Sequence, residues 1–179
     1  MLDSLQYVNL FVAVGAVVLQ VVTLLVILLL IFSRRENKIL SFIKENFLSI
    51  GFLLSLVPLL VSLFYSDVIG FAPCKLCWLQ RIALYPSCLL FGLAWWKKDR
   101  NISFYIFPLL VFGSLVALYH NFIYYFGEGI APCDSSGVSC VQRLVSEFGS
   151  YISIPSLSLT SFVSLIVLLA VVYFYKKDN

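Results

Sequence analysis

The run SLQYVNLFVAVGAVVLQVVTLLVILLLIFS, residues 4–33, holds thirty residues without one charged side chain. About 20 apolar residues suffice for a helix to cross the hydrocarbon core of a bilayer, so this run predicts a membrane-spanning helix. A cleaved signal peptide has a basic start and an apolar region of only about 7–15 residues. The residues MLD that precede the run contain no lysine or arginine. We therefore interpret residues 4–33 as a retained membrane anchor.

The rest of the chain has the same character. Of its 179 residues, 61% are hydrophobic and 12% are charged, whereas soluble domains average about 45–50% and 25%. This composition predicts an integral membrane protein of the all-α class. The net charge of +3 comes from scattered basic residues and gives no indication of nucleic-acid binding. Four further charge-poor segments predict spans at residues 46–66, at 82–96 (or from Trp78, if Arg81 extends toward the interface), at 101–126 and at 157–175.

The distribution of lysine and arginine predicts the orientation. Cytoplasmic loops of membrane proteins carry an excess of these residues. Nine of them lie on one side, in the first loop, the third loop and the C-terminal tail, against three on the other side. We therefore expect the N-terminus outside and the C-terminus in the cytoplasm. The nine are Arg34, Arg35, Lys38, Lys44, Lys97, Lys98, Arg100, Lys176 and Lys177, and the three are Lys75, Arg81 and Arg143.

Four of the five cysteines, Cys74, Cys77, Cys133 and Cys140, fall in the two loops expected outside. Disulfides persist outside the cytoplasm, so two disulfides or redox-active dithiols are expected, with three pairings open. Purely structural disulfides are the alternative, although a ring closed over two intervening residues restricts the unfolded chain little. The wide spacing of the second pair disfavours a zinc site, and we predict no metal. Cys88 lies within a span and is interpreted as a small hydrophobic residue.

The first cysteine pair stands in APCKLCWLQRIALYPS, residues 72–87. Pro73 favours the start of a helix, and a thiol near a helix N-terminus and a cation has a lowered pKa. Arg81 follows Cys77 by four residues, so both side chains are expected on one helix face. A cation inside a span usually marks function, most often by pairing with an anionic group. The alternative is that Arg81 binds a lipid phosphate.

The only histidine, His120, lies within the apolar segment LVALYHNFIYYF. A lone histidine there is often a core residue with its hydrogen bonds satisfied. His120 and Arg81 are nevertheless both expected near the outer membrane face on adjacent helices. With Trp78 and Tyr119 they could line an aromatic pocket suited to an amphiphilic redox ring with carbonyl oxygens, which is a quinone.

The stretch VQRLVSEFGSYI, residues 141–152, places apolar residues on one helical stripe. It predicts a short amphipathic helix in the interface plane that holds the second cysteine pair near the first. A plain re-entry segment leading to Pro155 fits the pattern equally well. The stripe consists of Val141, Leu144, Val145, Phe148 and Ile152.

Four motifs together resemble the DsbB family of thiol:quinone oxidoreductases, particularly its shorter BdbC-like branch. They are PCKLCWLQRIALYP, PCDSSGVSC, FGSYISIPSLSL and the histidine in LYHNF, and the resemblance covers residues 47–175. It implies a four-helix transmembrane bundle in residues 46–179 with two cysteine-bearing outer loops. Residues 1–45, an additional N-terminal transmembrane helix and a basic cytoplasmic loop, depart from the family pattern.

The resemblance also implies roles for single residues. Cys133 and Cys140 form the outer disulfide, which a reduced DsbA-like thioredoxin-fold partner attacks at Cys133. The Cys74–Cys77 disulfide reoxidises that pair through Cys140 and Cys74. Cys77 faces a bound ubiquinone or menaquinone as a thiolate.

Arg81 and His120 lie near the quinone, and electrons leave through the quinone pool to the respiratory chain. The location implied is the bacterial cytoplasmic membrane. Two other readings stay open: a vitamin K epoxide reductase-like quinone reductase, whose motif neighbourhood does not match CWLQR, and a non-enzymatic membrane scaffold with structural disulfides.

Overall fold

The computed structural model of the chain describes residues 2–32, 37–126, 140, 145, 148–149 and 151–175, and among these residues it contains helices but no strand. Five of the described helices are long and apolar enough to span a membrane, which confirms the predicted all-α membrane fold. The helical elements are α1 (Leu2–Phe32), α2 (Lys38–Glu45), α3 (Phe47–Leu63), the π-helical turn η1 (Phe64–Val68), α4 (Lys75–Lys97), α5 (Ser103–Phe126) and α6 (Ile154–Phe174).

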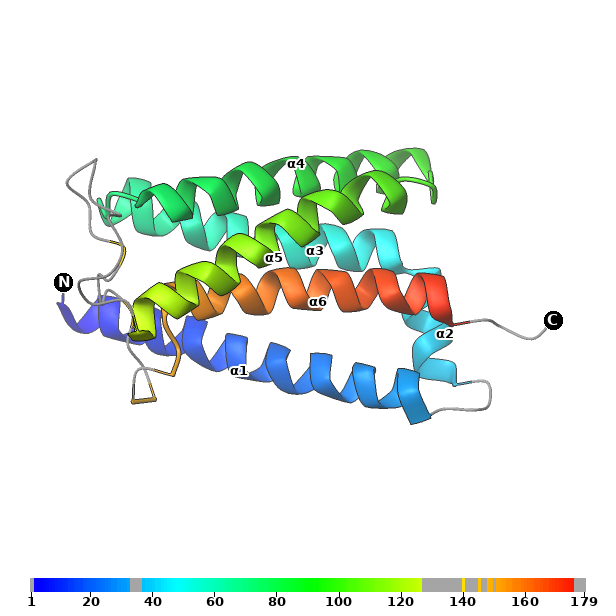
Figure 1. Ribbon diagram of the computed structural model, residues 1–179, viewed down its shortest axis with the longest axis horizontal. Helices are drawn as coiled ribbons and strands as arrows, with labels where there is room; N and C mark the ends of the chain where they lie inside the picture. The colour runs from blue at the N-terminus through cyan, green and yellow to red at the C-terminus, as the bar shows by residue number, and fades with distance from the viewer. Residues whose placement is uncertain are drawn as a thin grey trace.

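The helices α3, α4, α5 and α6 pack against one another as an antiparallel bundle, and α1 lies along α6 (Figure 1). The start of α4 and the end of α5 lie at one end of the bundle, and α2 lies at the other. Two glycines let helices approach closely, because the ring of Phe91 covers Gly51 and the ring of Phe162 covers Gly113. Small residues at such contacts are typical of membrane helices, where burial of apolar surface from lipid contributes little.

The helix α1 presents a stripe of small and polar residues to the bundle. The side chain of Asn9 accepts a 2.5 Å hydrogen bond from the hydroxyl of Tyr65. About three turns further along, Gln20 donates to the hydroxyl of Thr160 at 2.8 Å. The valines and leucines of α1 gain little by moving from lipid to the protein interior, because both are apolar. The polar contacts therefore contribute to holding α1 against the bundle. The buried residues of the stripe are Asn9, Ala13, Ala16 and Thr23, and Gln20 is half-buried.

The helix α2 is not among the elements predicted above, although the capping residue Asn37 and the apolar residues Leu40 and Ile43 at helical spacing indicate it. The side chain of Asn37 caps it by accepting a hydrogen bond from the N–H of Ile39 at 2.9 Å. The buried side chain of Leu40 packs against Val171 and Tyr175 at the end of α6. The basic loop between the first two spans is therefore partly helical and docked on the bundle.

The segment expected to form an amphipathic helix, residues 141–152, lies mostly outside the described residues. Of its apolar stripe, Val145 and Ile152 are buried, whereas Phe148 is exposed. Phe148 and Gly149 have φ angles of 53° and 69°, so the backbone there is left-handed and not α-helical. Val145, Phe148 and Gly149 are thus not part of an α-helix, and the other residues of segment 141–150 lie outside the described residues.

We expect Gly113→Val to lower the free energy of unfolding by about 1–3 kcal/mol, because the added side chain overlaps the ring of Phe162. Denaturation in detergent, followed by the helical circular dichroism signal, measures the loss. Gly15→Ala is the matched control, since a Cβ at Gly15 meets nothing within 4 Å. If Gly113→Val lowered the free energy of unfolding by the same amount in a Phe162→Leu background, overlap with the ring of Phe162 would not be the cause.

Candidate functional site

Cys74 and Cys77 lie together at the start of α4. Cys74 is the N-cap residue of α4, and its sulfur accepts a hydrogen bond from the N–H of Cys77 at 3.3 Å. The two sulfur atoms are 2.9 Å apart, and both thiols are free. Pro73 stands just before the cap, as expected for a residue that favours a helix start. The pair is therefore placed to interconvert between a dithiol and a disulfide with little movement.

The pKa of Cys74 is lowered to about 4. The hydrogen bond from the Cys77 thiol is the largest cause, and it outweighs burial, which raises the pKa. A hydrogen bond from His120 lowers the pKa of Cys74 further. The two thiols titrate as one coupled unit.

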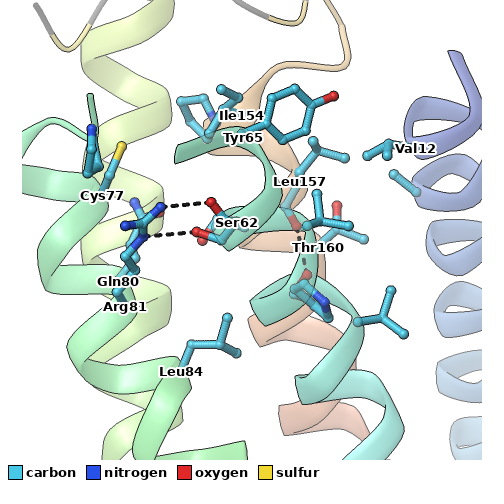
Figure 2. Close-up of a pocket in the computed structure, with 18 of the residues that line it drawn as sticks. Val12, Ser62, Tyr65, Cys77, Gln80, Arg81, Leu84, Ile154, Leu157 and Thr160 are labelled. Carbon is cyan, nitrogen blue, oxygen red and sulfur yellow. Dashed lines mark hydrogen bonds between the residues drawn. The ribbon is translucent and has the colours of Figure 1, made fainter. Parts of the chain in front are cut away.

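Arg81 lies inside α4 with only 9% of its surface exposed. Its Nε donates to the hydroxyl of Ser62 at 2.9 Å, and its Nη2 donates to the carbonyl of Ser62 at 2.8 Å. The guanidinium also stacks 5.3 Å from the ring of Trp78. Figure 2 shows Cys77 and Arg81 on the same side of α4, with the guanidinium directed at α3. Arg81 therefore points into the bundle and not toward a lipid phosphate.

His120 joins the two cysteine-bearing segments. Its Nδ1 is 3.1 Å from the amide nitrogen of Gln80, and its Nε2 is 3.2 Å from the carbonyl oxygen of Cys140. An amide nitrogen only donates, so Nδ1 is the acceptor and Nε2 carries the hydrogen that Cys140 receives. The same Nε2 lies 3.9 Å from the sulfur of Cys74. His120 is 2% exposed, so this arrangement is shielded from water.

Cys140 is buried and disulfide-bonded. It shares an apolar cluster with Cys74, Leu76 and Ile123. Cys133 and the rest of the loop that precedes Cys140 lie outside the described residues. The structure thus brings one residue of the second pair beside the first pair. Cys88 is buried and free in the middle of α4.

The ligand atoms of Cys74, Cys77 and His120 lie within 4.8 Å of one another, which is compact enough for a metal ion. This cluster is not predicted from the sequence. The prediction of no zinc considers only the spacing of Cys133 and Cys140, and His120 is distant in the chain from Cys74 and Cys77. Zinc needs a free lone pair on the histidine. The hydrogen bonds to Gln80 and Cys140 use both ring nitrogens. The arrangement therefore suits a hydrogen-bonded histidine better than a metal ligand.

A cavity of about 430 Å³ opens beside the first cysteine pair. Figure 2 shows the side chains of α1, α3, α4, η1 and α6 around it. Cys77, Gln80, Arg81 and His120 all line it, and most of the remaining wall is apolar. Trp78 and Tyr119, expected to line an aromatic pocket, are not among its lining residues and are 53% exposed each. The wall is largely aliphatic because small and branched residues of α1, α3 and α6 build it.

Gln80 and Ser62 are site residues that the sequence interpretation misses. Gln80 orients His120, and Ser62 holds Arg81. A signal for Gln80 exists, because a polar residue within a span is unusual for the same reason that Arg81 and His120 are. Ser62 carries no such signal, since serines are common on membrane helices.

The sequence matches the family model described as "Disulfide bond formation protein DsbB" over residues 44–172. It is 34% identical over 140 residues to the "Probable disulfide formation protein C 2" of Bacillus anthracis, covering 78% of this chain and 99% of the relative. It is also 34% identical over 138 residues to the "Disulfide bond formation protein C" of Bacillus subtilis, covering 74% of this chain and 96% of the relative. No solved structure gives a significant match. The chain belongs to the DsbB family of disulfide bond formation proteins.

We expect Cys77→Ala to raise the pKa of Cys74 toward the ordinary thiol value of about 8.5, because the main hydrogen-bond donor to its thiolate is removed. Cys77→Ser retains an O–H donor and should keep most of the depression. A lowered pKa means that Cys74 is thiolate above about pH 4, so the serine variant stays reactive at pH 6 and the alanine variant does not.

The pH dependence of Cys74 alkylation, read by mass spectrometry in a Cys88→Ala background, measures both pKa values. Equal Cys74 pKa values in the alanine and serine variants would contradict the hydrogen-bond explanation.

Proposed function

We propose that this chain is a thiol:quinone oxidoreductase that generates disulfides de novo and reoxidises a DsbA-like thioredoxin-fold partner. The observation that carries the proposal is the cavity, which connects the Cys74–Cys77 pair to an apolar space between membrane-spanning helices. A thiol pair that only stabilises a loop has no need of such a connection. Family membership supports the same activity.

The lining of the cavity fits a quinone, which combines an apolar ring with two carbonyl acceptors. Arg81 uses Nε and Nη2 on Ser62, and no hydrogen bond of Nη1 is found among the described residues. Nη1 therefore has donors to offer a carbonyl oxygen. Arg81 and Cys77 would hold the ring, and His120 borders the same end of the cavity. When bound, the quinone accepts the two electrons and two protons that a dithiol releases on becoming a disulfide.

The chain's own residues relay the oxidising equivalents. A thiolate of the reduced outer pair, which we assign to Cys140, attacks the sulfur of Cys74 and releases Cys77 as a thiolate. The second thiol of the outer pair, Cys133, then attacks Cys140 and releases Cys74. The low pKa of Cys74 makes it a good leaving group in this second step. The net result is one outer disulfide formed and one Cys74–Cys77 dithiol, with two electrons and two protons transferred.

His120 prepares this exchange. Its Nε2–H faces both the carbonyl oxygen of Cys140 and the sulfur of Cys74. The N–H therefore stabilises negative charge on sulfur where the two cysteine pairs meet. Gln80 keeps the hydrogen on Nε2 by occupying Nδ1. The reaction then restarts when the partner's dithiol attacks the Cys133–Cys140 disulfide at Cys133.

The proposal places the protein in the bacterial cytoplasmic membrane with both cysteine pairs outside. The N-terminus lies outside and the C-terminus in the cytoplasm, as the lysine and arginine distribution predicts. Electrons leave through the quinone pool to the respiratory chain.

Purified wild-type protein, mixed with a reduced thioredoxin-fold donor and a soluble quinone, should consume oxidised quinone, seen as a loss of its absorbance. Cys77→Ser should reduce turnover to background, because no Cys74–Cys77 disulfide can form. Cys88→Ser is the matched control and should stay close to wild type, because Cys88 lies buried in the middle of α4.

Three outcomes decide between this proposal and its rivals. No quinone consumption by the wild type would leave the scaffold reading. A greater loss in Cys88→Ser than in Cys77→Ser would overturn the assignment of the reactive pair. Turnover of a quinone epoxide in place of the quinone would favour a vitamin K epoxide reductase-like activity.

For Arg81→His we expect a KM for quinone roughly tenfold higher, since a hydrogen bond from a charged donor is worth about 1.5–3 kcal/mol. Lys75→His is the matched control, because Lys75 carries the same charge near the start of α4 but is exposed and does not line the cavity. Steady-state kinetics at varied quinone concentration measure both. An unchanged KM in Arg81→His would restrict Arg81 to holding α3 against α4 through Ser62.

A further inference from the structure

We propose that α1 forms the outer wall of the quinone site and that Gly15 leaves space there for the isoprenoid tail of the quinone. This inference rests on the proposed function and adds a tail-binding half to the site, built by a helix outside the family match. The match to the family model begins at residue 44, after α1 has ended. The wall is therefore a feature of this chain beyond the shared bundle.

The two ends of the cavity differ in chemistry. Arg81, Gln80 and the cysteines gather at one end, on α4. The wall that α1 and α3 supply is apolar over the residues that face the space between these helices. A membrane quinone has the same division, with a polar ring and a hydrocarbon tail. The apolar lining residues are Phe11, Val12, Gly15, Ala16 and Leu19 of α1 and Leu53, Leu54 and Val57 of α3.

The position of α1 is fixed on both sides of Gly15. The Asn9–Tyr65 hydrogen bond lies before it in the chain, and the Gln20–Thr160 hydrogen bond lies after it. Tyr65 and Thr160 themselves line the cavity, so α1 is bonded to the walls that it completes. Figure 2 shows Val12 of α1 across the space from Leu84 and Arg81 of α4.

Gly15 is the point at which a side chain would narrow the cavity. A Cβ built there meets no atom within 4 Å, so close packing does not explain the glycine. Its neighbour Ala13, by contrast, does not line the cavity and is fully buried in contacts with the bundle. Phe11 and Val57, on facing walls, are 80% and 58% exposed, so the cavity reaches the outer surface of the bundle between α1 and α3. A tail leaves the site through this opening, past Gly15.

The experiment compares the binding of a tail-less quinone and of a quinone with an isoprenoid tail to the full-length protein. Quenching of intrinsic tryptophan fluorescence gives each dissociation constant without turnover. Gly15→Leu should weaken binding of the tailed quinone about tenfold and leave the tail-less quinone unchanged, because the added side chain occupies only the tail half. Gly15→Ala should show a smaller effect of the same kind. Val18→Phe is the control, since Val18 is exposed on α1 and does not line the cavity.

Helical circular dichroism and thermal unfolding establish that each variant is folded. Val12→Phe narrows the same wall and replaces Gly15→Leu if the latter does not fold. Equal weakening of both quinones, or none in either wall variant, would overturn the tail site while leaving the proposed function intact. If neither quinone bound wild-type protein, the proposed function itself would fail.

Discussion

A guanidinium buried among membrane-spanning helices must find its hydrogen-bond partners inside the protein, and Arg81 finds them on Ser62. Leaving such a charge unpaired in an apolar surrounding costs several kcal/mol. The side-chain and main-chain oxygens of Ser62 therefore tie α4 to α3 one turn below Cys77. This tie adds to the packing of α3 against α4 beside the cavity that Ser62, Cys77 and Arg81 line.

A second polar connection runs toward the other cysteine pair. Gln80 fixes the tautomer of His120, and His120 binds the backbone of Cys140. Gln80 and Arg81 are adjacent in α4, but their side chains point to different neighbours. Gln80 contacts His120 of α5, and Arg81 contacts Ser62 of α3 beside the cavity. The start of α4 is thereby connected on one side to Cys140, through His120, and on the other side to the apolar cavity.

The sequence predicts the parts of this structure that depend on local chemistry. The charge-free runs predict the five spans, and the Cys-x-x-Cys pair with Arg81 four residues later predicts a helix start with a reactive thiol. The partners of these residues are not predictable in the same way, because Ser62 lies nineteen positions from Arg81 and resembles any serine of a membrane helix. The exposure of Trp78 and Tyr119 depends on helix rotation, which packing against neighbours decides. The sequence contains a signal for the face of α1 that packs against the bundle. Small and polar residues recur there at helical spacing among valines and leucines, at Asn9, Ala13, Ala16, Gln20 and Thr23.

Because the cavity opens between α1 and α3, a ligand would enter it from the lipid and not from water. Phe11 and Val57 border this opening on the outer surface, at positions that face lipid. A ligand that enters there diffuses in two dimensions and never crosses an aqueous layer. The concentration that determines binding is then the ratio of ligand to lipid in the bilayer, not the concentration of ligand in water. Apparent affinities of such a ligand measured in micelles will accordingly scale with the amount of detergent, and comparisons between preparations require a fixed ratio of ligand to amphiphile.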